Sequence, residues 1–505
     1  MPSSTSDRSL TDPKQNSLPL RTRLAFGVGA VGELVYLGMF NTFIGIFYNQ
    51  ALGLSNVLIG TAVLLALVGD AISDPAVGIA SDRWRSRLGR RHPFLFAAPV
   101  PLALTLWCVF NPPDMLTERV GDEFVVGELW LFAWLALFTT LSRFCVTLYS
   151  IPHLALGGEI VRSQYERSQL FSINAIFGYA AGALFGFGAW TMLGGQSANA
   201  DGVQVANHLV AKSYEPLSLI VCLVILFCVL LCAAGTFAKG RQLSQVPTDL
   251  EPITLASFLG KIFSTLKNRN YAMLLFGFLF FMISSSLFET FNVFVNTYLW
   301  QLGPEEIRWI GLAGVPGVVL GASISPVLMR RFDRKPVLLG SLVGMLVFSQ
   351  LMVDLRLLDL MPANGSPALL PLLVGNSFFF LFSLGLGGVA VFSMIADIID
   401  ENELLTGQRE EGLFYSARAF FAKLANSAGH FVAGVMLDLF VRIPVDAVPG
   451  ELGEDVLFRL ALAAGPLMGI AGIISLLFYT RYGLHRARHE EILRELEQRA
   501  SADVR

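Results

Sequence analysis

Long apolar runs alternate with short polar segments along most of the 505-residue chain. A helix needs roughly 20 apolar residues to cross a hydrocarbon core about 30 Å thick. The runs are continuously apolar, without a polar residue at every second position, which excludes the strands of a membrane β-barrel. We therefore predict an all-α membrane protein. Its twelve transmembrane helices are predicted near residues 24–48, 57–80, 93–110, 129–153, 170–193, 216–238, 271–298, 308–329, 336–354, 369–396, 414–441 and 456–480.

A polar stretch separates the first six predicted spans from the last six. The two halves resemble each other weakly: a short basic turn with an Asp, closed by a Pro, follows both the second span (81–93) and the eighth (330–336). Repeated halves with a cavity between them are typical of secondary transporters. The predicted organisation is an N-terminal tail (1–23), a six-helix half (24–238), a linker (239–270), a second six-helix half (271–480) and a C-terminal tail (481–505).

The distribution of basic residues predicts the orientation. Most of the 36 Lys and Arg residues fall in the two tails and the even-numbered loops. The odd-numbered loops hold only Arg119, Lys212, Arg308, Arg356 and Arg442. Because Lys and Arg accumulate in cytoplasmic loops, we expect both termini in the cytoplasm. The first 23 residues are polar and lack the features of a signal peptide. The expected location is a bacterial inner membrane.

Composition narrows the function classes. Hydrophobic residues make up 54% of the chain and charged residues 15%, whereas soluble domains have about 25% charged residues. These values exclude a disordered chain, a nucleic-acid binder and an ordinary soluble enzyme. The sequence contains no zinc-protease, serine-hydrolase or phosphate-loop motif, and its five cysteines lie within apolar runs. We expect no cofactor and a functional monomer.

Three motifs lie in the predicted second, fourth and tenth spans and the loops after them. They are residues 69–75 with 81–93, residues 149–159 with 165–167, and residues 396–400 with 407–412. In this order the motifs resemble those of the glycoside–pentoside–hexuronide:cation symporters, the melibiose-carrier-like branch of the major facilitator superfamily. The resemblance implies the major facilitator fold and cation-coupled sugar transport by alternating access. Animal lysophospholipid carriers share this branch, so an amphiphilic substrate is the alternative.

Asp70 and Asp74 are the first candidates for chemistry, because a charged side chain inside a span costs several kcal/mol and marks function. Their spacing of four places both on one helix face. Two adjacent carboxylates can hold Na⁺ or share a proton. The resemblance implies a cation site of Asp70, Asp74 and Thr147. Arg143 lies one turn before Thr147 and requires an acidic partner; if it pairs with either Asp, the site loses a Na⁺ ligand and proton coupling, or no coupling, is favoured.

Polar residues on other spans define a predicted substrate cavity. One face of the eleventh span carries Lys423, Asn426, Ser427 and His430. The family has a lysine at the position of Lys423, so the resemblance implies that Lys423 lies near the cation and substrate sites. The predicted cavity residues are Glu33, Tyr36, Ser150, Glu289, Asn292, Lys423 and Asn426. Ordinary hydrogen bonds between helices are the competing explanation for Asn426, Ser427 and His430.

The chain departs from the galactoside carriers of this family at the sugar site. Those carriers use two acids and an arginine, and Leu34, Ser150 and Ala175 stand at the matched positions. Since a site without bidentate polar partners discriminates poorly among hydroxyl-rich ligands, melibiose is not expected to be a substrate. The expected substrate is a glycoside, sugar or sugar acid, and a membrane channel or enzyme is the remote alternative.

Acidic and basic residues in the even-numbered loops predict a gate. Salt bridges in this region can form in one state of a transporter and break in the other. The predicted gating residues are Asp82, Arg83, Arg90, Asp397, Asp400 and Arg409. Anchoring of the topology explains the arginines alone but leaves the paired acids unexplained. The C-terminal tail is too polar to span a membrane and is predicted to form a charged surface helix.

Overall fold

A computed structural model of the protein describes residues 18–120, 123–161, 164–198, 202–241, 260, 262–407 and 410–503. Within these ranges, twelve helical segments are long and apolar enough to cross a membrane. They correspond one by one to the twelve predicted spans, so the predicted fold class is confirmed. Most of the predicted linker lies outside the described residues, and the predicted boundaries of tails, halves and linker stay predictions.

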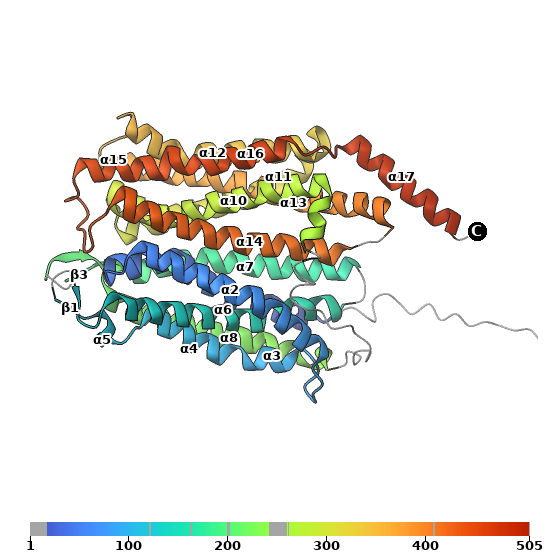
Figure 1. The fold of residues 1–505 in the computed structure, drawn as a ribbon, viewed down its shortest axis with the longest axis horizontal. Coiled ribbons are helices and arrows are strands. Elements are labelled where there is room, and N and C mark those ends of the chain that lie inside the picture. Colours follow the sequence, from blue (N-terminus) through green and yellow to red (C-terminus); the bar gives the residue numbers. More distant parts are fainter. Residues whose placement is uncertain are drawn as a thin grey trace, which may run out of the picture.

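The helices of the first half form one side of a long bundle (Figure 1). They are α1 (Leu20–Ile46), α2 (Asn56–Arg83), α3 (His92–Ala97), α4 (Pro99–Phe110), α6 (Glu128–Glu159), α7 (Gln164–Met192) and α8 (Tyr214–Gly240). The third span is divided into α3 and α4 next to Pro99. The missing N–H of proline weakens a helix in this way. Between spans lie the short helix α5 (Asp114–Thr117) and two antiparallel hairpins, β1 (Arg119–Val120) with β2 (Glu123–Phe124) and β3 (Gln196–Ala198) with β4 (Gln204–Ala206).

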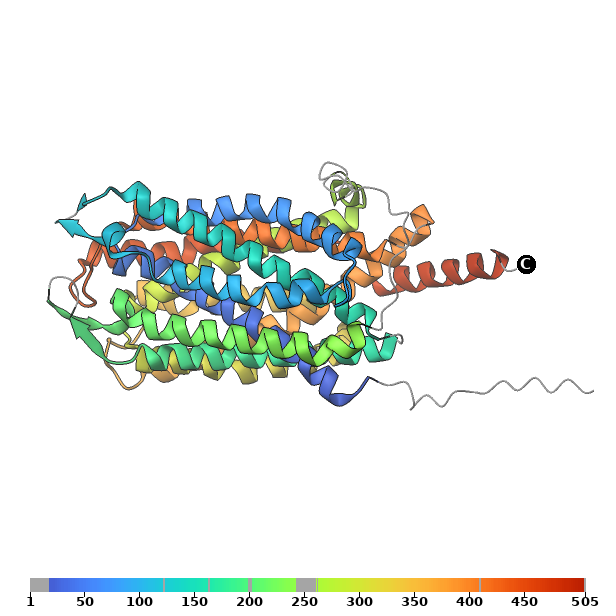
Figure 2. The same cartoon turned by 90° about the horizontal axis from the view of Figure 1, so that it is seen from below.

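The helices of the second half form the other side of the bundle. They are α10 (Arg269–Phe294), α11 (Pro304–Phe332), α12 (Arg334–Leu357), α13 (Leu369–Thr406), α14 (Glu411–Val435), α15 (Glu454–Leu462) and α16 (Met468–Thr480), followed by the tail helix α17 (Arg486–Asp503). In the described residues, π-helical turns follow α1 (Phe47–Ala51), α10 (Val295–Leu299) and α14 (Met436–Val441), and a further one (Ala463–Leu467) joins α15 to α16. Figure 2 shows α17 leaving the bundle at the end opposite the hairpins. The predicted charged tail helix is therefore present.

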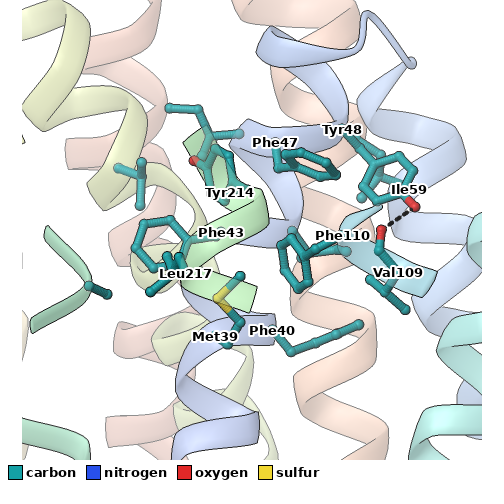
Figure 3. Packing of buried hydrophobic residues seen from close by; sticks show 14 of the residues in the cluster. Met39, Phe40, Phe43, Phe47, Tyr48, Ile59, Val109, Phe110, Tyr214 and Leu217 are labelled. Atoms are coloured by element: carbon teal, nitrogen blue, oxygen red, sulfur yellow. Dashed lines mark hydrogen bonds between the residues drawn. The ribbon is translucent and has the colours of Figure 1, made fainter. Parts of the chain in front are cut away.

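The two halves meet chiefly along two helix pairs, α2 with α14 and α7 with α11, and α1 also contacts α10. Inside the second half, glycines allow α11 and α13 to approach closely. A side chain at Gly317 or Gly321 would collide with the backbone of α13 at Phe378 or Phe382. Small residues at such crossings are a general feature of membrane helices. In the first half, aromatic rings fill the core instead, and Figure 3 shows the Tyr48 hydroxyl donating to the Val109 carbonyl oxygen at 2.7 Å.

Polar contacts join the halves at the end of the bundle that carries the odd-numbered loops. The Asp438 carboxylate accepts hydrogen bonds from Ser55 Oγ at 2.8 Å and Asn56 Nδ2 at 2.7 Å. Arg119 Nη1 lies 2.9 Å from Asp446 Oδ2. Each contact links a residue of the first half to one of the second. This end is therefore closed in the structure.

Candidate functional site

The two predicted carboxylates lie in a cluster of four charged side chains from three helices. Arg143 of α6 contacts Asp70 of α2: its Nε donates to Asp70 Oδ2 at 3.0 Å, and its Nη2 lies 2.9 Å from the same oxygen. Lys423 of α14 donates from Nζ to Asp74 Oδ2 at 2.6 Å, and the same nitrogen lies 3.5 Å from Asp70 Oδ2. Thr147 Oγ1 donates to Asp74 Oδ1 at 2.8 Å. The predicted cation-site residues Asp70, Asp74 and Thr147 therefore lie together in the structure, in contact with Arg143 and Lys423.

Helix geometry explains the cluster. Asp70 with Asp74, and Arg143 with Thr147, are each four residues apart, so each pair lies on one face of its helix. The helices α2 and α6 pack along these faces, while α14 packs on α2 from the other half. Of the five residues, only Lys423 belongs to the second half. The Lys423–Asp74 ion pair therefore connects the halves, whereas the Arg143–Asp70 pair is contained within the first.

Burial differs between the two ion pairs. The Asp70 side chain is 3% exposed and that of Arg143 16%, whereas those of Asp74 and Lys423 are 29% and 36% exposed. The formal charges of the two acids and two bases cancel. Arg143 is permanently charged and pairs with Asp70. This is the arrangement in which we expect the site to lose a Na⁺ ligand.

Two of the other predicted cavity residues lie next to the charged cluster, since Glu33 interacts electrostatically with Lys423, and Tyr36 with Arg143 and Asp70. Asn426 Nδ2 donates to Ser286 Oγ at 3.0 Å, a bond between α14 and α10. Tyr36 Oη is bonded to Ser142 Oγ at 2.9 Å. For these two residues the structure therefore provides protein partners of the kind expected from interhelical hydrogen bonding. Glu33 and Ser150 are half-buried, on α1 and α6.

Several buried polar atoms of α10 and α14 have no hydrogen-bond partner among the described residues. His430 Nδ1 is bonded to Thr290 Oγ1 at 2.9 Å, but its Nε2 is unpartnered. The same holds for Ser427 Oγ and Glu289 Oε2. Since buried polar groups are usually hydrogen-bonded, these atoms are available to water or a ligand.

A cavity of about 320 Å³ lies where α7 ends and α11 begins. Of the predicted substrate residues, Asn292 is among those that line it. Its walls also contain Trp190, Trp300 and Arg308, which sequence analysis did not select. Arg308 entered that analysis only as a charge in an odd-numbered loop. The sequence signal was present, because a basic residue in a loop that is otherwise poor in basic residues is unusual.

Four of the six predicted gating residues, Asp82, Arg90, Asp397 and Asp400, lie in ion-pair clusters, each within one half. In the first half, Glu159 binds Arg90 at 2.8 Å and Arg91 at 2.7 Å, and Arg91 also contacts Asp82. The sequence analysis missed the role of Glu159, although it lies at the end of the second motif. Arg83 is the last residue of α2.

In the second half, Asp397 Oδ2 lies 3.0 Å from Arg334 Nη1, and Asp400 Oδ2 lies 3.0 Å from His489 Nε2. His489 belongs to α17, so the C-terminal helix takes part in this cluster. Its participation was not predicted. Arg409 lies outside the described residues, and the gating role of all six residues stays a prediction.

Twelve membrane-length helices in two groups of six, one closed end and charged residues where the groups meet are typical of a secondary transporter of the major facilitator fold. The chain belongs to the family of MFS/sugar transport proteins, whose model matches residues 25–486. It is 23% identical to an uncharacterised symporter of Synechocystis sp., with 95% of this chain and 97% of that one covered. It is 24% identical to an Escherichia coli protein named "Putative glycoside/cation symporter", with 96% of each chain covered.

A solved structure supports the fold independently. The crystal structure of a bacterial homologue of the human lysosomal transporter Spinster superposes with a TM-score of 0.63, covering 95% of this chain and 99% of that chain at 13% identity. The protein is thus an integral membrane transporter, and the resemblance stated from the three motifs is confirmed.

Proposed function

We propose that the protein couples the uptake of a sugar or glycoside to proton movement by alternating access. The observation that carries this proposal is the ion pair between Lys423 of the second half and Asp74 of the first, at 2.6 Å. Because this ion pair joins the two halves, protonation of its carboxylate changes how strongly the halves are held together. The names of the symporter relatives support coupling to a cation.

Protons fit the cluster better than Na⁺ because of the number of oxygen ligands each needs. With Arg143 on Asp70 and Lys423 on Asp74, the four formal charges cancel, and either cation adds one positive charge. Na⁺ also needs several oxygen ligands, whereas Asp70 Oδ2, Asp74 Oδ1 and Asp74 Oδ2 already accept from Arg143, Thr147 and Lys423. A proton arriving at Asp74 instead neutralises that carboxylate and weakens its bond to Lys423. Asp74 is therefore the proposed proton acceptor, with Thr147 orienting its second oxygen.

The predicted orientation completes the proposal. Both termini lie in the cytoplasm of a bacterial cell, and the end closed by Asp438 and Arg119 faces outward. The protein works as a monomer, with one transport pathway between its halves. Protonation from outside is then followed by release of the proton and sugar inside. Transport of a lysophospholipid by the same cycle is the alternative substrate class.

The proposal is tested with the full chain in proteoliposomes. Labelled D-glucose, D-galactose, D-glucuronate and D-galacturonate are offered under an inward proton gradient without Na⁺, and under an inward Na⁺ gradient at uniform pH. Accumulation of at least one sugar above equilibrium is expected only with the proton gradient, and a protonophore abolishes it. Accumulation driven by Na⁺ alone would refute proton coupling, and uptake of lysophosphatidylcholine without uptake of any sugar would refute the substrate class.

A further inference from the structure

Glycines leave the cavity beside α7 open rather than allowing helices to pack across it. Gly182 and Gly186 of α7 and Gly311 of α11 all line the cavity, and a Cβ atom added at any of them would meet nothing within 4 Å. Gly317 and Gly321, by contrast, have the neighbouring backbone against them. The three cavity glycines therefore provide space. A volume of about 320 Å³ lies at the lower end of the roughly 300–1,000 Å³ of small-molecule sites.

Arg308 brings a positive charge to this cavity, and Glu305, which lies three residues earlier on α11 and interacts with it electrostatically, does not line the cavity. Its guanidinium carbon lies 5.6 Å from the ring centre of Phe187 and 5.5 Å from that of Trp309. Its Nη1 makes one long hydrogen bond, 3.5 Å to Thr191 Oγ1, and its Nε is buried without a partner. In the described part of the chain no carboxylate lies within ion-pair distance of Arg308, and none of the described lining residues is acidic. The cavity is therefore suited to an anion.

The remaining walls combine aromatic rings with amides. Trp190 and Trp300 line the cavity, and Asn292 and Asn376 present amide groups to it. Asn376 Nδ2 donates to the Phe348 carbonyl oxygen at 2.8 Å, but its Oδ1 is buried and has no partner. Indole rings offer flat apolar surfaces, and an unpaired amide oxygen accepts a hydrogen bond from a hydroxyl group. A sugar ring has flat apolar faces bordered by hydroxyl groups, so its surface is complementary to these walls.

We propose that this cavity binds the carboxylate or sulfonate form of a sugar, with Arg308 on the anion, Asn376 on a hydroxyl group and the tryptophans against the ring. The proposal rests on the sugar transport proposed above and specifies its substrate class. The positions of the charged sugar-binding residues are occupied by Leu34, Ser150 and Ala175, which carry no charge. In this proposal the contact between Arg308 and the anionic group of the sugar replaces the contacts that those residues would make. Specificity then comes from the end of α11 and not from the first, fourth and fifth spans.

The first experiment compares matched neutral and acidic sugars. Binding of D-glucuronate and D-galacturonate, and of D-glucose and D-galactose, is measured by calorimetry with the purified full chain. The parent is expected to favour at least one acid over its neutral counterpart. Arg308→Gln should weaken binding of that acid by about 10- to 100-fold, the effect of losing a charge-assisted hydrogen bond, and leave neutral sugars unaffected. Arg308→Lys, which keeps the charge, should retain more of the preference.

The second experiment fills the cavity from α7. Gly186→Leu places a side chain in the open space and should abolish acid binding. Gly188→Leu is the matched control, because Gly188 lies on the same helix, also has nothing within 4 Å of an added Cβ, and does not line the cavity. Its acid binding should equal that of the parent. Equal loss in both variants would overturn the site.

The outcomes separate the two proposals. Transport of neutral sugars with no preference for acids, unchanged by Arg308→Gln, overturns the anionic site and leaves sugar transport standing. If no sugar is transported and lysophosphatidylcholine is, the proposed function fails and the site falls with it. Acid preference that Gly186→Leu and Arg308→Gln remove supports the site.

Discussion

Replacing Arg143 by Gln should convert the protein into one that responds to Na⁺. At 2.9 Å from Asp70 Oδ2, the guanidinium contributes an attraction of about 6 kcal/mol at an effective dielectric constant of about 20, before the cost of desolvation. Removing it leaves two carboxylates that share one ammonium group. The cluster then has a net charge of −1, and the position beside Asp70 is open to a monovalent cation.

Stability gives the magnitude. Breaking a buried ion pair costs about 3–5 kcal/mol. We expect about 3 kcal/mol here, because Lys423 Nζ stays 3.5 Å from Asp70 Oδ2. Adding Asp70→Asn to Arg143→Gln should restore most of that loss, since the double variant has no unmatched charge. If Na⁺ binds the single variant with a Kd of about 1 mM, 100 mM NaCl stabilises it by about 2.7 kcal/mol.

Thermal unfolding of the three proteins in detergent, with NaCl or choline chloride, measures these effects. NaCl should raise the Tm of Arg143→Gln and leave the parent and the double variant unchanged relative to choline chloride. Na⁺ stabilisation of the parent, equal to that of Arg143→Gln, would show that Arg143 does not stand in for a bound cation. An unstable double variant would show that the cluster contributes through packing and not through charge balance.

Four further outcomes are expected. Lys423→Ala should reduce gradient-driven uptake far more than Arg418→Ala at equal expression. Lys423 bridges the halves, whereas the Arg418 guanidinium carbon lies 4.4 Å from the ring centres of both Phe278 and Phe392. Comparable residual uptake in the two variants would count against the bridge. Asp70→Asn and Asp74→Asn should each abolish accumulation yet retain part of sugar exchange, and full accumulation by both would eliminate the carboxylate site. Melibiose should show no saturable binding in calorimetry, given Leu34, Ser150 and Ala175. His489→Ala should make α17 more sensitive to limited proteolysis, because its bond to Asp400 at 3.0 Å is lost; an unchanged digestion rate would mean that Arg486 and Arg499 hold the helix alone.

The membrane-spanning fold was predictable because length and apolarity are local properties of a sequence. The placement of Asp70 with Asp74, and of Arg143 with Thr147, was predictable for the same reason, because residues four apart lie on one face of a helix. Which acid Arg143 binds was not, because Asp70 and Asp74 share that face and only the packing of α6 on α2 distinguishes them. Sequence analysis stated both partners, and the structure selects Asp70.

The cavity beside α7 was beyond sequence reasoning for a different reason. Its walls come from both halves, and glycines that leave space look the same in sequence as glycines that let helices touch. Gly186 and Gly317 illustrate this: the first faces open space and the second faces the Phe378 carbonyl oxygen. Likewise, Glu159 and His489 gain their roles from neighbours far away in the chain. Their interactions depend on contacts that no local pattern contains.

The two bases of the central cluster have chemistries that match their positions. Arg143 keeps its charge at any physiological pH, and its partner Asp70 lies in the same half, so this pair can persist while the halves move. Lys423 reaches across the seam to Asp74, so its bond must lengthen when the halves rearrange. A single protonation at Asp74 makes that separation less costly, whereas protonation elsewhere in the cluster leaves the bridge intact. Exchanging the two bases, as in Arg143→Lys with Lys423→Arg, conserves every formal charge and should still impair accumulation, because the rigid bidentate group would then hold the seam. Proton-driven accumulation by this swapped variant at the parent's rate would refute this assignment of roles.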